Sequence, residues 1–419
     1  MLPKYETKQT AQAFTIRRWW SIGFIPLLIF AVGCPTGGLN ELADSEEERY
    51  LIAVPSREGV ADREIDSNRE PAPTDGTGRI GEAREVDADK STDPLTERVA
   101  AVLDRGLRHR RLASDVNAAW QVMHGVLAYG RDFVVHTPAG PQPAVEYVLG
   151  GGPLRGFTLR GGDRFEIDGR QVRGVIAELD PGQKIGQGHR DQWVAYMARC
   201  GLTDDVTVTT ADGVLTMAGW IRQMEWDVPL NFEAEYSWTL TALLAHRPTT
   251  HRWTARDGRQ YSIESLLESE IRQLSPTSAC GGSHRLCAIA TAVNHRREAG
   301  LPVAGVWQDA ADLVSLAIEH AHDYQNPDGT FSSHYFDRPG WSPDLVTALG
   351  TTGHLFEFLA VAGDDELLAL PWVRSAGAAL CDILEQTESI DLECGALYHA
   401  LSGLAIYDQR TRGSAPAPE

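Results

Sequence analysis

The sequence predicts an all-α protein whose helices form an α/α toroid of about six helical hairpins, with a small β-hairpin insertion. Three observations predict this class. Helical segments with a single apolar stripe alternate with helical segments that are apolar or small on every side. The chain has 419 residues, of which 42% are apolar, enough for one large domain. A histidine also recurs inside the apolar segments, as in the stretch "SACGGSHRLCAIATAV".

Residues 1–34 have the composition of an export signal. Four basic residues precede the apolar run "WWSIGFIPLLIFAVG", which is shorter than the roughly 20 residues that span a bilayer as a helix. The run ends in "AVGC", which resembles the lipobox of bacterial lipoproteins, with Ala31 where leucine is usual. The resemblance implies that Cys34 is acylated and becomes the mature N-terminus. An uncleaved signal anchor is the alternative, and both predict a protein tethered to the membrane in the cell envelope, outside the cytoplasm.

Residues 35–95 are predicted to be an acidic, disordered linker. They are rich in Pro, Gly, Asp and Glu and have almost no aromatic side chains, so they cannot bury enough apolar area to offset the entropy of ordering. The whole chain has a net charge of -20, without the clustered Lys and Arg that a nucleic-acid interface needs. We therefore expect a tether to the membrane and no nucleic-acid partner.

The helical domain is predicted to span residues 96–410, followed by a flexible tail over 411–419. The helices with one apolar stripe, predicted to be outer, are 96–112, 211–226, 262–274, 308–324 and 372–387. The uniformly apolar helices, predicted to be inner, are 118–130, 188–202, 232–246, 284–293, 350–363 and 394–407. One outer helix is missing, and residues 132–179 show alternation and glycine turns in its place, which predicts a β insertion over one mouth of the toroid.

Two segments resemble the terpene cyclase and protein prenyltransferase superfamily. The loop "YQNPDGTF" is similar to its QW-type element through Gln325, Asp328, Gly329 and Phe331, and "YHALSGLAIYDQ" is similar to its closing inner helix. The resemblance implies a toroid and a loop that ties an outer helix to the next inner one. Ala396 occupies the position of the family's metal-binding histidine, and the sequence has neither a DxDD nor a DDxxD motif, so the family's ionisation chemistry is not implied.

Histidines are the main candidates for a functional site. One lies 8 to 12 residues after a Ser or Asp cap signal in five of the six inner segments, which predicts comparable depth in parallel helices. Structural bonding to a neighbouring helix, a cavity lining and direct proton transfer are the three interpretations. The candidate cavity-lining residues are His124, His189, Glu235, His284, His354, Glu357 and His399.

The cysteines and carboxylates leave further alternatives open. Zinc at Cys280, His284, Cys394 and His399 is one, and a disulfide between Cys280 and Cys394 is another. Paired carboxylates among Asp191, Glu233, Glu235 and Glu357 are typical of glycoside cleavage. No HExxH, nucleophile elbow, P-loop or dinucleotide motif is present, and no cofactor is predicted.

The sequence therefore favours a tethered domain that binds an organic ligand, an isoprenoid or a glycan, in its central cavity. An enzyme that uses histidines with carboxylates or zinc on such a substrate is the second hypothesis. A non-catalytic scaffold with a packed centre is the third. Fold class alone does not choose among them.

Overall fold

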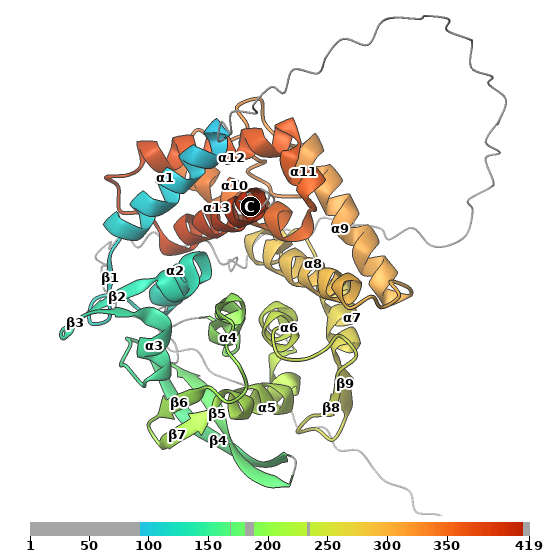
Figure 1. The fold of residues 1–419 in the computed structure, drawn as a ribbon. Coiled ribbons are helices and arrows are strands. Elements are labelled where there is room, and N and C mark those ends of the chain that lie inside the picture. The colour runs from blue at the N-terminus through green and yellow to red at the C-terminus, as the bar shows by residue number, and fades with distance from the viewer. Residues whose placement is uncertain (1–92, 168, 181–187, 233–234, 414–419) are drawn as a thin grey trace, which may run out of the picture. The chain divides into compact units, whose positions relative to one another are not determined.

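A computed structural model describes residues 93–167, 169–180, 188–232 and 235–413 (Figure 1). Thirteen α-helices and a few short strand pairs make up this part of the chain, so the prediction of a mostly helical protein is confirmed. The export signal with Cys34, nearly all of the predicted linker, Glu233 and residues 414–419 lie outside the described residues.

Six central helices form a closed series of contacts, in which each helix packs against the next and the last packs against the first. They are α2 (Ala119–Tyr129), α4 (Gln192–Tyr196), α6 (Tyr236–Leu244), α8 (Ser283–Glu298), α10 (Leu345–Ala362) and α13 (Cys394–Gly413). Every one of them coincides with a segment that is apolar on all sides in the sequence, because each is covered both by its neighbours and by a second layer of helices.

Five outer helices pack on the central ones: α1 (Pro94–His109), α5 (Met217–Asp227), α7 (Ile263–Gln273), α9 (Val306–Asp323) and α12 (Pro371–Gln386). Each buries one apolar stripe; α1, for example, buries Val99 and Val102 and exposes its charges. Asp93 caps α1 and pairs with Arg374 of α12, which joins the first outer helix to the last.

Short strands occupy the predicted insertion, but they do not cover a mouth. They are β2 (Val134–Thr137), β3 (Gly140–Pro143), β4 (Phe157–Ile167) and β5 (Arg170–Leu179), with α3 (Ala144–Leu149) between the two hairpins and β1 (Leu112–Ala113) beside β2. The antiparallel β4–β5 hairpin packs on the side of α5, where Gln223 accepts a hydrogen bond from the Asp163 amide.

Three other elements differ from the sequence prediction. The predicted helix 211–226 begins only at Met217, because β7 (Gly213–Thr216) pairs with β6 (Thr207–Thr210). A further hairpin, β8 (Arg252–Thr254) with β9 (Gln260–Ser262), leads into α7, and α11 (Asp365–Ala369) precedes α12. Short 3-10 turns, including one over Ala279–Gly282 before α8, complete the described chain.

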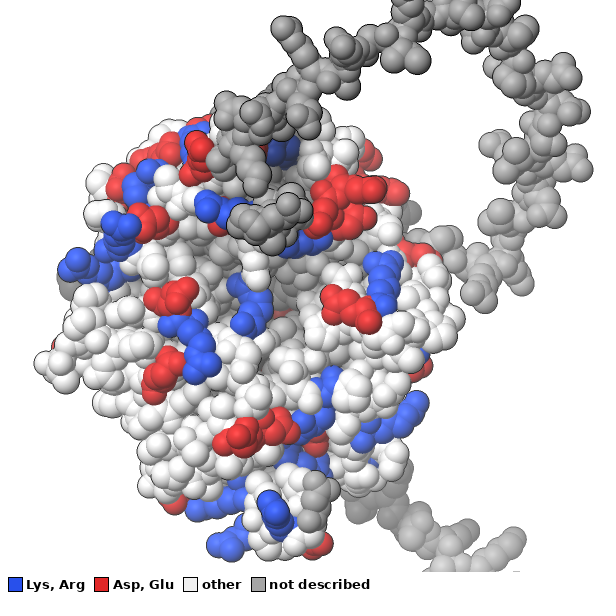
Figure 2. Space-filling model, in the orientation of Figure 1, with Lys and Arg blue, Asp and Glu red and all other residues white. Residues whose placement is uncertain are grey.

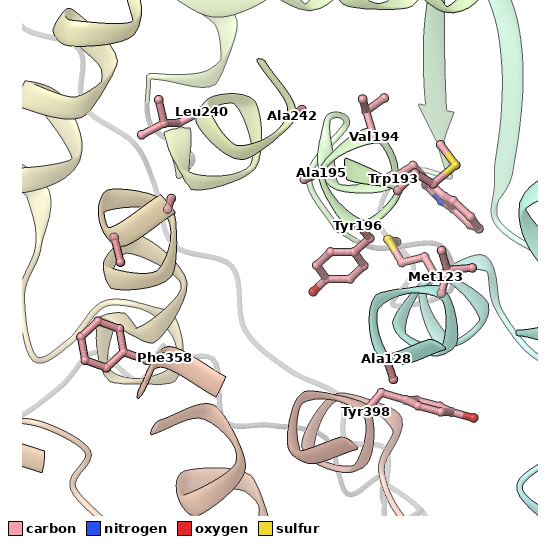
Figure 3. Close-up of a cluster of buried hydrophobic side chains, with 14 of the residues drawn as sticks. Met123, Ala128, Trp193, Val194, Ala195, Tyr196, Leu240, Ala242, Phe358 and Tyr398 are labelled. Atoms are coloured by element: carbon pink, nitrogen blue, oxygen red, sulfur yellow. The ribbon is translucent and has the colours of Figure 1, made fainter. Parts of the chain in front are cut away.

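The core lies between neighbouring helices and between the central and outer layers. Figure 3 shows part of it, in which Met123 of α2 lies near Trp193 of α4 and Tyr196 extends toward the space that the central helices enclose. Helices α10 and α13 make the closest crossing: a Cβ at Gly353 would stand 2.9 Å from the Ala400 backbone, and one at Gly403 would stand 2.8 Å from the Glu357 nitrogen. These two glycines let the helices that carry His354, Glu357 and His399 approach each other.

Helix α10 is also the one described helix with the length and composition of a membrane span. However, 67% of that stretch is buried inside the protein, as in the core helix of a globular domain.

The loop that resembles a QW element ties neighbouring helices together. The Gln325 side chain donates to the carbonyls of Gly329 at 3.0 Å and Trp372 at 2.9 Å, which connects the end of α9 to the start of α12. The Phe331 amide donates to Thr352 of α10 at 3.1 Å. The loop thus joins the outer helix α9 to the next central helix, α10.

Candidate functional site

A cavity of about 1230 Å³ lies among the six central helices. Each helix lines it with residues at or near its C-terminal end, so all six end at the same mouth: Leu127, Arg199, Ala245, Glu298, Ala362 and Arg410. Figure 2 shows acidic and basic side chains interspersed over this face, without a field of a single sign. No described residue of the β insertion at 132–179 lines the cavity, so the insertion does not shape it.

The cavity floor, which we define as Tyr196, His284, Glu357 and His399, collects the polar groups farthest from the mouth along α4, α8, α10 and α13. The Nδ1 of His399 lies 2.6 Å from Oε2 of Glu357, and its Nε2 lies 3.5 Å from the Tyr196 hydroxyl. The same hydroxyl is 3.3 Å from Nε2 of His124, whose Nδ1 donates to the Trp120 carbonyl at 2.6 Å. Contacts on both nitrogens fix the orientation of each imidazole.

Burial sets the protonation of this floor. It raises the pKa of Glu357, an effect that the Ser402 hydroxyl and the nearby His354 partly oppose. Burial also lowers the pKa of His399 well below its ordinary value, and the positive charges that His354 and His284 can carry lower it further. The Tyr196 hydroxyl, whose pKa burial raises, stays protonated. A neutral imidazole therefore faces a tyrosine hydroxyl at the bottom of the cavity.

The structure brings four of the five candidate histidines together. The ring of His399 lies 4.1 Å from that of His354, 5.3 Å from that of His284 and 5.4 Å from that of His124, centroid to centroid. Of this group, His284 and His399 line the cavity, whereas His354 and His124 lie behind its wall. Packed so closely, the four rings cannot all be protonated.

His189 lies apart from this group. Its segment becomes helical only at Gln192, so His189 precedes α4, where its Nδ1 accepts a hydrogen bond from the Asp191 amide at 3.0 Å. The Asp191 carboxylate is itself bound by Asn231 and Thr239. Within the described ranges no ring contact joins His189 to the other four histidines. The hydrogen bonds to Asp191 come from neighbouring segments, so this carboxylate has a structural role.

A second group of reactive atoms lies beside the floor. Ligand atoms of Cys280, His284 and His354, the Cys–His–His cluster, all lie within 4.8 Å of one another. The Glu235 carboxylate is 3.4 Å from Nδ1 of His284. Cys280 has φ 49°, in the left-handed region that a residue with a side chain rarely occupies, and Gly281 and Gly282 continue the same turn into α8. This turn aims the thiol at both imidazoles.

Charge coupling within the cluster changes the thiol. Burial alone would raise the pKa of Cys280, but the positive charges of the nearby His354 and His284 lower it to about 5. Burial lowers the pKa of His284, and the Cys280 thiolate and Glu235 more than reverse this, so that its pKa lies well above the ordinary value. The charges of the two imidazoles therefore favour the thiolate form of Cys280.

The other cysteines do not join this cluster. The Sγ of Cys394 lies 3.6 Å from the side-chain amide nitrogen of Gln121. The five described cysteines are all free thiols, so the alternative of a Cys280–Cys394 disulfide is wrong. The four-residue zinc set considered from the sequence is not assembled either. The cluster joins His354 to Cys280 and His284, and neither Cys394 nor His399 belongs to it.

Tyr196 is the floor residue that sequence reasoning missed. It stands in an apolar segment next to Trp193 and Met197, where a tyrosine is most simply a core residue. The only signal in the sequence was the hydroxyl itself, which in the structure bridges two histidines.

No family model matches the chain, and no match was found among curated proteins or solved structures. The site must therefore be interpreted from its own geometry.

Proposed function

We propose that the six central helices are the inner ring of an α/α toroid of the terpene cyclase and prenyltransferase type, and that its cavity binds an organic ligand. The closed series of helix contacts supports the toroid, and so does the Gln325 loop. A concave site with apolar walls and a few converging polar groups is typical of small-molecule binding.

The walls favour a ligand with an apolar body and a polar head. Ala195, Trp238, Val361 and Ile406 give the cavity its apolar surface. Hydrogen-bonding side chains lie at the floor and also along the walls, where Thr241, Thr291, Asn294 and Ser402 line the cavity. We propose an isoprenoid alcohol, whose apolar body the four apolar side chains would cover and whose hydroxyl the floor would bind. A glycan, whose hydroxyls the polar wall residues could bind, is the alternative ligand.

We further propose that the protein is an enzyme that moves a proton to or from this ligand with His399. The Glu357–His399 contact of 2.6 Å carries the proposal. A Glu357 carboxylate that accepts Nδ1–H leaves the lone pair of Nε2 as a base. The imidazolium formed when Nε2 takes a proton is stabilised by the same carboxylate and is the acid that returns this proton. In both states Nε2 is the reacting atom, and Tyr196 stands where the ligand's polar group would be positioned.

Substitution of His399 tests this proposal. Geranylgeraniol is the probe, and its binding is expected to raise the melting temperature, since ligand at a hundredfold excess over Kd stabilises by about 2.7 kcal/mol. In D2O the bound probe is expected to gain carbon-bound deuterium, since its hydroxyl proton exchanges freely without the protein. His399→Gln is expected to lower the rate of this carbon exchange by about 10² to 10⁴ fold without abolishing binding. The control is His322→Gln on α9, whose side chain is 56% exposed.

Two outcomes would count against the proposal. Absence of any thermal shift with the probe would remove the isoprenoid cavity. Equal exchange rates in wild type, His399→Gln and Glu357→Gln would leave a binding protein without acid–base chemistry at this dyad.

The N-terminal segment is proposed to tether this domain to a membrane through Cys34. Cys34→Ser is therefore expected to abolish acylation and to move the protein from the membrane to the soluble fraction of the cell envelope. Metabolic labelling with an alkyne fatty acid, followed by fractionation, measures both effects. A labelled and membrane-bound Cys34→Ser protein would refute the lipid anchor, whereas an unlabelled wild type that stays membrane-bound would indicate the uncleaved signal anchor.

A further inference from the structure

The two histidines of the Cys–His–His cluster carry buried nitrogens without hydrogen bonds. Nδ1 of His354 donates to the Gly350 carbonyl at 2.6 Å, so its Nε2 has a free lone pair, and this atom has no hydrogen-bond partner. Both ring nitrogens of His284 are buried without one as well. Three such atoms in one place are unusual, because an unsatisfied buried polar atom costs roughly 1–3 kcal/mol.

These nitrogens converge on the Cys280 thiol rather than scattering. The ligand atoms of the three residues lie within 4.8 Å of one another, and among the described residues this is the one group of three or more Cys, His, Asp or Glu side chains with that geometry. From this convergence we infer a zinc site that the cavity function does not require: Cys280, His284 and His354 bind Zn²⁺ through one sulfur and two nitrogens.

The donor set and its surroundings fit zinc. One thiolate and two imidazoles match the borderline-soft character of Zn²⁺, and three protein ligands leave a fourth, open position in a tetrahedral site. The His354 Nδ1–H bond to a carbonyl is the support that metal-ligating histidines usually have. Glu235, 3.4 Å from Nδ1 of His284, provides a carboxylate in the same role and leaves Nε2 for the metal.

Charge and strain support the same conclusion. The negative charges of the Cys280 thiolate and the Glu235 carboxylate balance the two positive charges of Zn²⁺. Without the ion, the thiolate and the two imidazoles lie together at low dielectric, where a charge without a partner is costly. The left-handed turn at Cys280, φ 49°, is strained, and such strain is retained where it serves a site. His284 belongs both to the cluster and to the cavity floor, so the ion would lie next to the bound ligand.

Cobalt and zinc binding by the full chain tests the inference. After chelation and dialysis, Co²⁺ is expected to give the intense near-ultraviolet thiolate band and visible bands of a tetrahedral site, and mass spectrometry is expected to find stoichiometric zinc after Zn²⁺ replaces it. Cys280→Ser is expected to lose the thiolate band. Glu235→Gln is expected to keep the band and to weaken zinc affinity by about 10 to 100 fold. Cys394→Ser, which removes a buried thiol outside the cluster, is the matched control and should bind like wild type.

The result that overturns the inference is equal zinc content and an equal cobalt spectrum in wild type and Cys280→Ser, or no thiolate band in wild type. If Cys280→Ser fails to fold, the test uses His354→Gln and wild type, both depleted of metal with a chelator. Added Zn²⁺ should then restore the melting temperature of the wild type and not that of His354→Gln. Binding of geranylgeraniol and exchange by His399 are separate measurements, so either proposal can fail while the other stands.

Discussion

Glu270→Ala is expected to lower the free energy of unfolding by about 3–5 kcal/mol, the usual cost of removing one partner from a buried ion pair. The Glu270 side chain on α7 is fully buried and lies 2.6 Å from Nη1 of Arg285 on α8. It also accepts hydrogen bonds from the Tyr236 amide and the Ser237 hydroxyl at the start of α6. Its loss leaves the buried Arg285 guanidinium without its ion-pair partner and the first turn of α6 without its acceptor.

Glu268→Ala on the same helix is the matched control. Glu268 pairs with Arg272 at the surface, where both side chains are about half exposed or more, so we expect a change of no more than about 0.5 kcal/mol. Chemical denaturation monitored by circular dichroism measures both variants. A loss below 1 kcal/mol for Glu270→Ala would contradict the claim that this carboxylate holds α6, α7 and α8 together.

Gly353→Ala is expected to destabilise the protein by about 1–3 kcal/mol, even though alanine is intrinsically the better helix former by about 1 kcal/mol. The added Cβ would stand 2.8 to 2.9 Å from atoms of Ala400, two of which are backbone atoms that cannot rotate away. Helices α10 and α13 would have to move apart, and this movement would break the Glu357–His399 hydrogen bond.

Gly350→Ala, one turn earlier on α10, tests the same helix with the opposite expected sign. Its Cβ would meet only the Ala396 Cβ, at 3.5 Å, an ordinary contact. We therefore expect this variant to be neutral or up to about 1 kcal/mol more stable. Denaturation curves measure the stabilities, and histidine NMR shows whether the imidazole of His399 keeps its hydrogen bond. Equal effects at the two glycines would show that close approach does not position the dyad.

The helices could be predicted from the sequence because a helix buried on one side has one apolar stripe, and a helix buried on all sides is apolar all round. The segments 284–293 and 394–407, for example, lie wholly within α8 and α13. The pattern failed at residues 213–216, because a short apolar run is equally compatible with a strand, and the turn at Gly213, φ 119°, selects the strand. It also overestimated α4, which ends in a 3-10 turn before the left-handed Gly201.

The candidate site was harder to predict, because it depends on the rotation of each helix about its axis. Recurrence identified His124, His284, His354 and His399, but not which nitrogens face each other. Helix α8 starts after a left-handed turn at Cys280, Gly281 and Gly282, so helical periodicity could not place Cys280 relative to His284. The partner of Cys280 is His354, on another helix, and only the packing of α8 against α10 brings them together.

The shared direction of the central helices has an electrostatic consequence. Each helix carries a partial negative charge at its C-terminal end, and the C-terminal ends of all six face the cavity mouth. Their macrodipoles therefore add rather than cancel, which makes the entrance unfavourable for anions beyond what the side chains alone imply. Arg199, Arg297 and Arg410 line this entrance and oppose that potential. A neutral ligand head group crosses such an entrance at lower cost than a diphosphate, whose charge these guanidinium groups would have to balance.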